Sequence, residues 1–211
     1  MILDISNYQS ILCLDGELPF SFLQQTALPM VATDGAANKL VAHGLKPSCI
    51  VGDLDSVEPS LLKQYPYVRD ANQDATDFEK ALSYLKRKNL LPTIVVGLSG
   101  GCLDRVLTNM SIWLQSNAAY VSEDLVGFPL RQDGTFDWPI NAKVSLLGGL
   151  NGVVTSQGLR WELHQTTLAF GGFCSCSNRV QSSPVTLQVQ GTILVFVYRN
   201  PVHDAGSLES D

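Results

Sequence analysis

Residues 1 to about 122 alternate between short apolar runs and stretches in which apolar residues recur at helical spacing. Several of the runs are apolar on both faces, which is typical of strands covered by helices. This alternation predicts a parallel sheet with right-handed crossovers. The predicted strands are 11–14, 29–33, 48–51, 67–69, 93–98 and 118–122. The predicted helices are 36–43, ending at Gly44, then 57–64, 77–88 and 103–115.

From about residue 125 the helical periodicity disappears, and short strand-like runs are separated by turn signals such as Asn151-Gly152 and Gln190-Gly191. Several short strands at this spacing predict a small β-sandwich or barrel. The predicted strands are 143–147, 152–155, 159–163, 174–177, 185–190 and 192–198. We therefore expect an α/β domain over 1–124 and a β-sandwich domain over 125–211.

The composition is that of a globular protein, with 45% apolar and 16% charged residues among 211. The net charge of -6 disfavours nonspecific nucleic-acid binding, which needs a basic surface. No apolar run reaches the ~20 residues that span a bilayer, so we expect no membrane segment. The N-terminus has no basic region followed by an apolar core, which argues against a secretory signal. The odd count of 5 cysteines, including Cys174 and Cys176, indicates reduced thiols and a cytoplasmic location.

Asp53 and Asp55 stand one residue apart directly after a predicted buried strand. Alone, this spacing is more often a solvated acidic turn than a metal site. However, four further aspartates of the first half also lie just after predicted strands or in the loops that follow them. Ligands of open parallel sheets bind beyond the carboxyl ends of the strands, so these carboxylates should surround one crevice. Close carboxylates repel one another, and Mg²⁺ relieves that repulsion. The four others are Asp34, Asp74, Asp77 and Asp104.

Each of these aspartates also has a structural interpretation. Asp34 could be the N-cap of the helix over 36–43, Asp74 and Asp77 could cap the helix over 77–88, and Asp104 could favour the dipole of its own helix. Their convergence at one sheet edge nevertheless favours a metal-assisted site. A glycine-rich turn at Gly100 and Gly101 precedes a predicted helix, where backbone N–H groups can bind a phosphate. Carboxylates and such a turn together indicate a polyphosphate bridged by Mg²⁺.

Six motifs follow one another along the chain: Asp34-Gly35-Ala36-Ala37-Asn38, Gly52-Asp53-Leu54-Asp55-Ser56, the run from Asn72 to Lys80, Gly100-Gly101-Cys102-Leu103-Asp104, the run from Gly158 to Leu163, and Ser175-Cys176-Ser177-Asn178. In this order and at these spacings, they make the chain resemble the thiamin pyrophosphokinase family from about residue 31 to 180. The resemblance implies a Rossmann-like ATP-binding domain followed by a thiamin-binding sandwich. It also implies a homodimer with active sites between subunits, and transfer of pyrophosphate from ATP to thiamin, giving thiamin diphosphate and AMP.

The resemblance also implies roles for individual residues. The catalytic and Mg²⁺-binding carboxylates would be Asp53, Asp55 and Asp77. The thiamin contacts would be Gln73, Asp77, Trp161 and Ser175, the last two offered to the other subunit's site. The nucleotide and phosphate surroundings would be Asp34, Asn38, Thr76, Gly100, Gly101, Asp104 and Arg105. An aromatic such as Trp161 can stack on the flat aminopyrimidine and attract the thiazolium cation, although a tryptophan of a sandwich domain is more commonly a core residue.

One departure from the family pattern concerns the phosphate site. The family usually has Arg where this chain has Cys102, and commonly His where it has Arg105. Arg105 lies three residues along at a helix start, and we hypothesise that it takes over the lost phosphate contact. The departure keeps open a second interpretation, a catalytically weak thiamin or nucleotide binder of the same fold. A third interpretation, a nucleotidyl or glycosyl transferase with an Asp-x-Asp motif that uses sugar nucleotides, gains little from the run between Gln73 and Lys80 or from the sandwich motifs.

Overall fold

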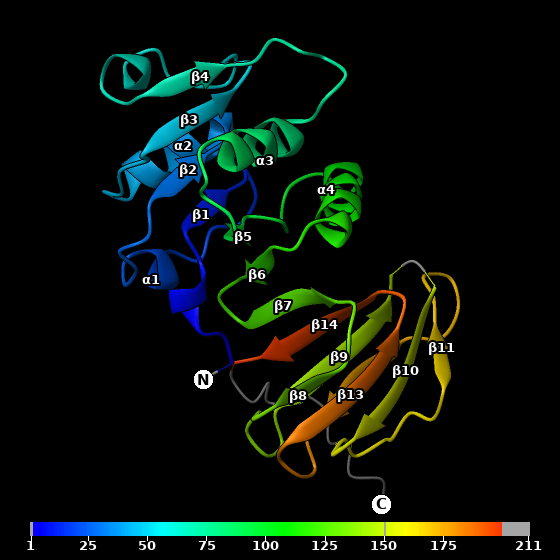
Figure 1. The fold of residues 1–211 in the computed structure, drawn as a ribbon. Helices are drawn as coiled ribbons and strands as arrows, with labels where there is room; N and C mark the ends of the chain where they lie inside the picture. The colour runs from blue at the N-terminus through cyan, green and yellow to red at the C-terminus, as the bar shows by residue number, and fades with distance from the viewer. Residues whose placement is uncertain (1, 150, 200–211) are drawn as a thin grey trace, which may run out of the picture. The chain divides into compact units, whose positions relative to one another are not determined.

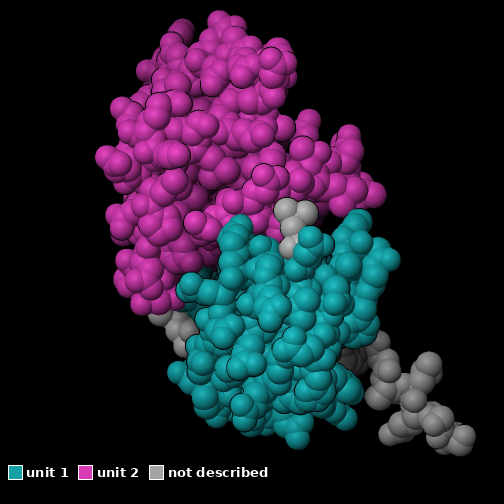
Figure 2. Space-filling model, turned by 45° about the vertical axis from the view of Figure 1, so that its right-hand side comes forward, with its two compact units in different colours: residues 1–3, 124–211 teal, residues 4–123 magenta. Residues whose placement is uncertain are grey.

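The computed structural model describes residues 2–149 and 151–199. The chain divides into two compact units, residues 4–123 and residues 124–211 together with 1–3 (Figure 2). We call the first the α/β unit and the second the sandwich unit. Their architectures confirm the predicted fold class, a parallel α/β sheet followed by two packed antiparallel sheets. No helix within the described ranges is long and apolar enough to cross a membrane.

The α/β unit is built on six parallel strands in the order β6-β5-β1-β2-β3-β4 (Figure 1). Every residue of the strands is buried except in β4, which lies at the edge of the sheet. This burial explains why the strands are apolar on both faces. The strands are β1 Ser10–Cys13, β2 Met30–Ala32, β3 Cys49–Gly52, β4 Tyr67–Arg69, β5 Thr93–Val96 and β6 Ala119–Val121.

Helix ends in this unit follow local signals in the sequence. Before α3, Thr76 and Glu79 form a reciprocal capping box. After α2, Gly44 adopts a φ of 74° and Leu45 N–H bonds Leu40 C=O, which terminates the helix as predicted. The helices are α1 Phe20–Leu23, α2 Asp34–Ala42, α3 Asp77–Arg87 and α4 Leu103–Gln115, with 3₁₀ turns η1 Ile5–Asn7 and η2 Leu61–Lys63.

The helix predicted over 57–64 is wrong, because only the 3₁₀ turn η2 forms there. Val57 and Leu61 are the residues of this stretch that are buried, too few to form an apolar helix face. Glu58 N–H donates to the side chain of Asn38 at 3.0 Å, which anchors the start of the segment. The segment therefore forms a loop with one 3₁₀ turn.

The sandwich unit contains two antiparallel sheets, in the orders β12-β9-β14-β7 and β11-β10-β13-β8 (Figure 1). Buried residues alternate along β10 and β13, as expected for strands with one face in a core. That core includes Trp138, Leu146 and Leu187. The strands are β7 Leu125–Leu130, β8 Gly134–Phe136, β9 Lys143–Gly148, β10 Gly152–Gln157, β11 Thr166–Leu168, β12 Ser175–Arg179, β13 Val185–Gln190 and β14 Ile193–Tyr198.

The strand predicted over 159–163 is also wrong, because this segment makes only an isolated bridge between Leu159 and Val180. The Glu162 carboxylate accepts the N–H groups of Gly158 and Leu159 at 2.7 and 3.1 Å, which bends the segment into a turn. Trp161 therefore lies on a loop. Three strands, β7, β8 and β11, were not predicted. Each is only three residues long or contains Gly and Pro.

Candidate active site

The cleft of the α/β unit lies at the carboxyl edge of its sheet. β1 and β5 are neighbours there, and the chain runs from β1 to β2 on one side and from β5 to β6 on the other. Such a switch point leaves a crevice between the two sets of loops. The cleft has a volume of about 470 Å³. It is lined by Leu14, Asp15, Thr33, Asp34, Gly35, Asp53, Asp55, Ser56, Thr76, Asp77, Phe78, Asp104, Arg105, Thr108 and Asn109.

Three carboxylates converge in the cleft. Asp34, Asp53 and Asp55 each place an oxygen within 4.8 Å of the others. Leu54, between the last two, has a φ of 70°, a left-handed conformation that costs a non-glycine residue about 1–2 kcal/mol. This turn is braced by Asp55 N–H, which donates to Asp53 Oδ1 at 3.3 Å, and by Ser56 Oγ, which donates to Asp55 Oδ1 at 2.8 Å. The strained turn brings both carboxylates to the same place.

Asp34 is the buried member of this cluster. The residue is 3% exposed, and neither carboxylate oxygen has a hydrogen-bond partner of good geometry among the described residues, although the backbone N–H of Leu54 opposes the rise in its pKa. Burial raises the pKa of Asp34 to about 6, and the nearby charges of Asp77 and Asp53 add to the rise. A Cβ atom at Gly52 would overlap Asp34 Oδ1, so a larger residue there would displace this carboxylate. A buried carboxylate without a donor is the group that a cation would satisfy.

Asp53 and Asp77 have compensating partners. The N–H of Asp55 lowers the pKa of Asp53, and the Gln73 side chain contributes in the same direction. Asp77, in the first turn of α3, pairs with Lys80 Nζ at 3.1 Å. Burial lowers the pKa of Lys80, but the hydrogen bond that its ammonium donates to Asp77 and the charges of the surrounding carboxylates outweigh this effect and raise the pKa. Lys80 therefore supplies a fixed positive charge beside the carboxylates.

Three residues of this region were not among the predicted site residues: Asp15, Lys39 and Lys80. Asp15 directly follows the first predicted strand, the same signal that identified Asp34 and Asp53. Lys39 Nζ pairs with Asp15 Oδ1 at 2.8 Å and donates to the Gly16 carbonyl at 3.0 Å. Lys80 is 5% exposed, and a lysine on the buried face of a helix, three residues after an aspartate, was an available signal.

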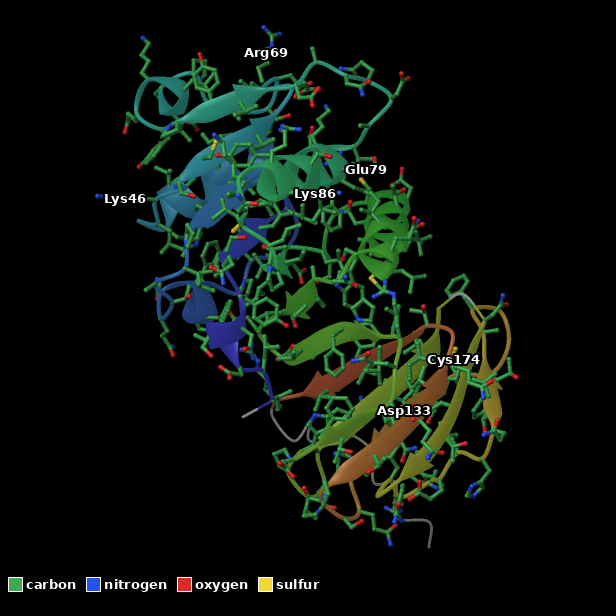
Figure 3. All side chains as sticks on the ribbon, viewed as in Figure 1. Lys46, Arg69, Glu79, Lys86, Asp133 and Cys174 are labelled. Carbon is green, nitrogen blue, oxygen red and sulfur yellow. The ribbon has the colours of Figure 1, made fainter. Side chains whose placement is uncertain are left out.

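Several residues predicted to contact the nucleotide make hydrogen bonds within the protein. Asn38 Nδ2 donates to the Ser56 carbonyl at 2.8 Å, while its Oδ1 accepts from Glu58, so its amide clamps the loop after β3. Thr76 caps α3 through Glu79, which Figure 3 labels at the start of that helix. Asp104 accepts the Arg105 N–H at 2.9 Å in the first turn of α4.

Other predicted residues lie beside the cleft or away from it. Gly100 and Gly101 follow β5 with φ values of 94° and 79°, and Gly100 fits against Glu17, but neither lines the cleft. Gln73 and Asp74 are exposed residues of the loop before α3 and do not line it either. Of the aspartates expected around one crevice, Asp74 alone is outside it. Cys102, at the N-cap of α4, is exposed and makes no side-chain cap.

In the sandwich unit, Trp161 is a surface residue, since 55% of it is exposed. This excludes the interpretation of Trp161 as a core residue, a role that Trp138 fills at 3% exposure. The Arg160 guanidinium lies over the Trp161 ring, 4.9 Å from its centroid. Ser175, at the start of β12, is 8% exposed. The unit thus offers an accessible indole and a nearby hydroxyl.

The fold and the cleft define a two-part α/β and β-sandwich protein with a carboxylate cluster at a nucleotide-type switch point. Comparisons with known proteins agree with this class. Residues 20–122 match the model of the thiamin pyrophosphokinase catalytic domain, and residues 139–194 match that of the thiamin pyrophosphokinase vitamin B1 binding domain. Since the two models together match most of the chain, the protein belongs to the thiamin pyrophosphokinase family and is an enzyme.

Sequence identity to individual relatives is low. Thiamine pyrophosphokinase 1 of rice is 26% identical over 223 residues, covering 87% of this chain and 84% of the relative. Thiamine pyrophosphokinase 2 of Arabidopsis thaliana is 28% identical, covering 78% and 75%. Among solved structures, yeast thiamin pyrophosphokinase superposes with a TM-score of 0.77 at 16% identity, covering 93% of this chain and 88% of that one. At that identity the structural likeness shows the fold alone.

Proposed function

We propose that this protein transfers the pyrophosphoryl group of ATP to the hydroxyethyl oxygen of thiamin. The observation that carries the proposal is the cluster of Asp34, Asp53 and Asp55 at the sheet's switch point, in a chain of this family. The hydroxyl oxygen attacks the β-phosphorus, and the bond from that phosphorus to the α,β-bridging oxygen breaks. The products are thiamin diphosphate and AMP, and the hydroxyl proton passes to a carboxylate of the cleft.

The residues of the cluster fit Mg²⁺, which prefers carboxylate and phosphate oxygens. The fit rests on Asp34, whose two buried oxygens have no partner among the described residues. Asp53 and Asp55 would hold the ion as predicted, with Asp34 in place of Asp77, which pairs with Lys80. When bound, the ion would supply charge neutralisation to the transferring phosphates. Lys80 and Arg105 would provide the cleft's own positive charge.

Trp161 and Ser175 of the sandwich unit are the proposed contacts of thiamin, together with Gln73 and Asp77 of the α/β unit. The exposed indole supports stacking on the aminopyrimidine. Five free cysteines are consistent with the proposed cytoplasmic location. The experiment that tests the function is incubation with ATP, Mg²⁺ and thiamin, followed by measurement of AMP and thiamin diphosphate in equal amounts.

The second candidate is a thiamin or nucleotide binder with little transferase activity. It is favoured by Cys102, which provides no guanidinium for the phosphates. Thiamin binding without AMP in that assay would support this candidate and contradict the proposed reaction.

Arg105→Ala is expected to raise the KM for ATP about tenfold, because the cleft would lose its guanidinium. Arg105 Nη1 lies 4.0 Å from Asp15 Oδ2, and 70% of its side chain is exposed, so it can reach a phosphate. Initial rates at varied ATP concentration provide the measurement. The KM for ATP of Arg105→Lys, which keeps the charge but not the bidentate geometry, should lie between those of the wild type and of the Ala variant. An unchanged KM in the Ala variant would refute the compensating role.

We further propose a homodimer in which Trp161 serves the site of the other subunit. Asp53→Asn and Trp161→Ala should each be nearly inactive alone, because each removes one half of the site. Mixed after unfolding and refolding together, they should regain activity, because heterodimers would contain one intact composite site. The measurement is AMP formation by the mixture. A mixture no more active than its components would contradict a site shared between subunits.

A further inference from the structure

Asn178 is a buried polar residue of β12 that the mechanism above does not use. It is 1% exposed, and its side-chain amide makes four hydrogen bonds. Oδ1 accepts from Trp161 N–H at 3.1 Å and from Arg179 N–H at 2.8 Å. Nδ2 donates to the Trp161 carbonyl at 2.7 Å and to Ser175 Oγ at 3.2 Å. The amide is thereby fully occupied within the protein.

These bonds satisfy both backbone polar groups of Trp161, which lies on a loop. Segment 159–163 is not paired as a strand, yet both backbone polar groups of Trp161 bind one buried side chain. Arg160 N–H extends the contact by donating to the Arg179 carbonyl at 2.8 Å. The indole itself remains 55% exposed. A rigid backbone beneath an exposed ring is the arrangement that holds a stacking surface in place.

The same amide fixes the direction of the hydrogen bond at Ser175. Because Nδ2 donates to Ser175 Oγ, the serine oxygen accepts this bond with one of its lone pairs, and the hydroxyl proton stays available for another acceptor. That proton can be given to an acceptor atom on a ligand. The aminopyrimidine of thiamin carries ring nitrogens that accept such a bond. Asn178 thus fixes both the position of the Trp161 indole and the direction of the hydrogen bond at the Ser175 hydroxyl.

We propose that Asn178 is a positioning residue for thiamin, acting through Trp161 and Ser175 without touching the substrate. This inference rests on the proposed function, in which those two side chains contact thiamin. It goes further by assigning the Ser175 hydroxyl as a hydrogen-bond donor to thiamin. Asn178 is the residue whose own donated bond leaves that hydroxyl proton available.

The test variant is Asn178→Asp, which keeps the size and the Oδ1 acceptor. It replaces the Nδ2 donor by an oxygen that repels the Trp161 carbonyl and can take the Ser175 proton. The Kd and KM for thiamin should rise about tenfold. The KM for ATP should stay nearly unchanged, because the ATP cleft is lined by the α/β unit. Asn178→Ser, which removes the whole amide without adding charge, should raise the thiamin Kd and KM as well.

Thiamin binding can be measured without the reaction, because Trp161 is the exposed tryptophan. Trp113 and Trp138 are 0% and 3% exposed, so a ligand that stacks on the surface should quench mainly Trp161. The control is Ile193→Ala, which removes buried methyl groups from β14 of the same unit. It should lower the unfolding midpoint while leaving the thiamin Kd unchanged.

The outcomes separate this inference from the proposed function. A selective rise in the thiamin constants for both Asn178 variants, absent in Ile193→Ala, supports the positioning role. An equal rise for thiamin and ATP, or a change that merely follows the unfolding midpoint, overturns it. If the wild-type protein binds thiamin but forms no AMP, the proposed reaction fails while the fluorescence titration still decides the role of Asn178. A wild-type protein that does not respond to thiamin overturns both.

Discussion

Asp53→Asn or Asp55→Asn is expected to lower the rate of AMP formation by about 10³-fold while leaving the fold intact. Each substitution keeps the size of the side chain but removes one negative charge from the cluster that would hold Mg²⁺ on the phosphates. The turn itself should persist, because an amide oxygen at position 53 can still accept the Asp55 N–H. The measurements are AMP formation at saturating ATP and thiamin, and circular dichroism of each variant.

The matched control for these substitutions is Asp74→Asn. Asp74 is an exposed aspartate of the same unit, but it lies outside the cleft. Its loss should change AMP formation less than about twofold. Near-wild-type activity in either cluster variant, or an equal loss in the control, would refute the assignment of the cluster to the reaction.

Asp34→Asn is expected to stabilise the Mg²⁺-free protein at pH 7 and at the same time to impair the reaction by about 10²-fold or more. The pKa of Asp34 is about 6 in the folded protein, against an ordinary value of 3.8. Between these values the folded chain binds more protons than the unfolded chain, so the free energy of unfolding falls as pH rises. The asparagine removes this penalty, on the order of 1–3 kcal/mol at neutral pH.

Urea unfolding at about pH 4 and pH 7, with and without Mg²⁺, checks this expectation. Without the ion, the variant should be more stable than the wild type at pH 7, and the difference should shrink toward pH 4. Adding Mg²⁺ should stabilise the wild type and have little effect on the variant. Equal stabilisation of both by Mg²⁺ would show that Asp34 is no ligand of the ion. An unchanged difference between the two pH values would contradict the burial argument.

Most of the fold was predictable from the sequence, because its signals are local. Strand–helix alternation, the capping glycine at position 44 and the turns of the second half each act over a few residues. The errors occur where side chains from distant segments decide the structure. Asn38 anchors the loop after β3 by its bonds to Ser56 and Glu58, 18 and 20 residues away, and Glu162 bends 159–163 against its apolar pattern.

The residues of the candidate active site were predictable to a similar extent. Position after a strand identified Asp34, Asp53 and Asp55, because parallel strands end at one edge. It did not reveal that Asp34 lies within 4.8 Å of both other carboxylates, or that Asp77 pairs with the buried Lys80, because both depend on contacts between segments. Likewise, the role of Asn38 as a clamp and the bonds of Asn178 depend on contacts between segments, which no spacing in the sequence records.

The left-handed turn at Leu54 limits which residues can replace it. Asparagine, aspartate and glycine adopt a φ near 70° readily, whereas β-branched residues rarely do and proline cannot. The position therefore has a narrow set of allowed substitutions, although its side chain has no chemical part in the proposed reaction. Among related sequences, the residue at this position should therefore be chosen for its ability to adopt a positive φ rather than for its hydrophobicity. Its identity would show whether the carboxylates of the two flanking aspartates can still lie close together.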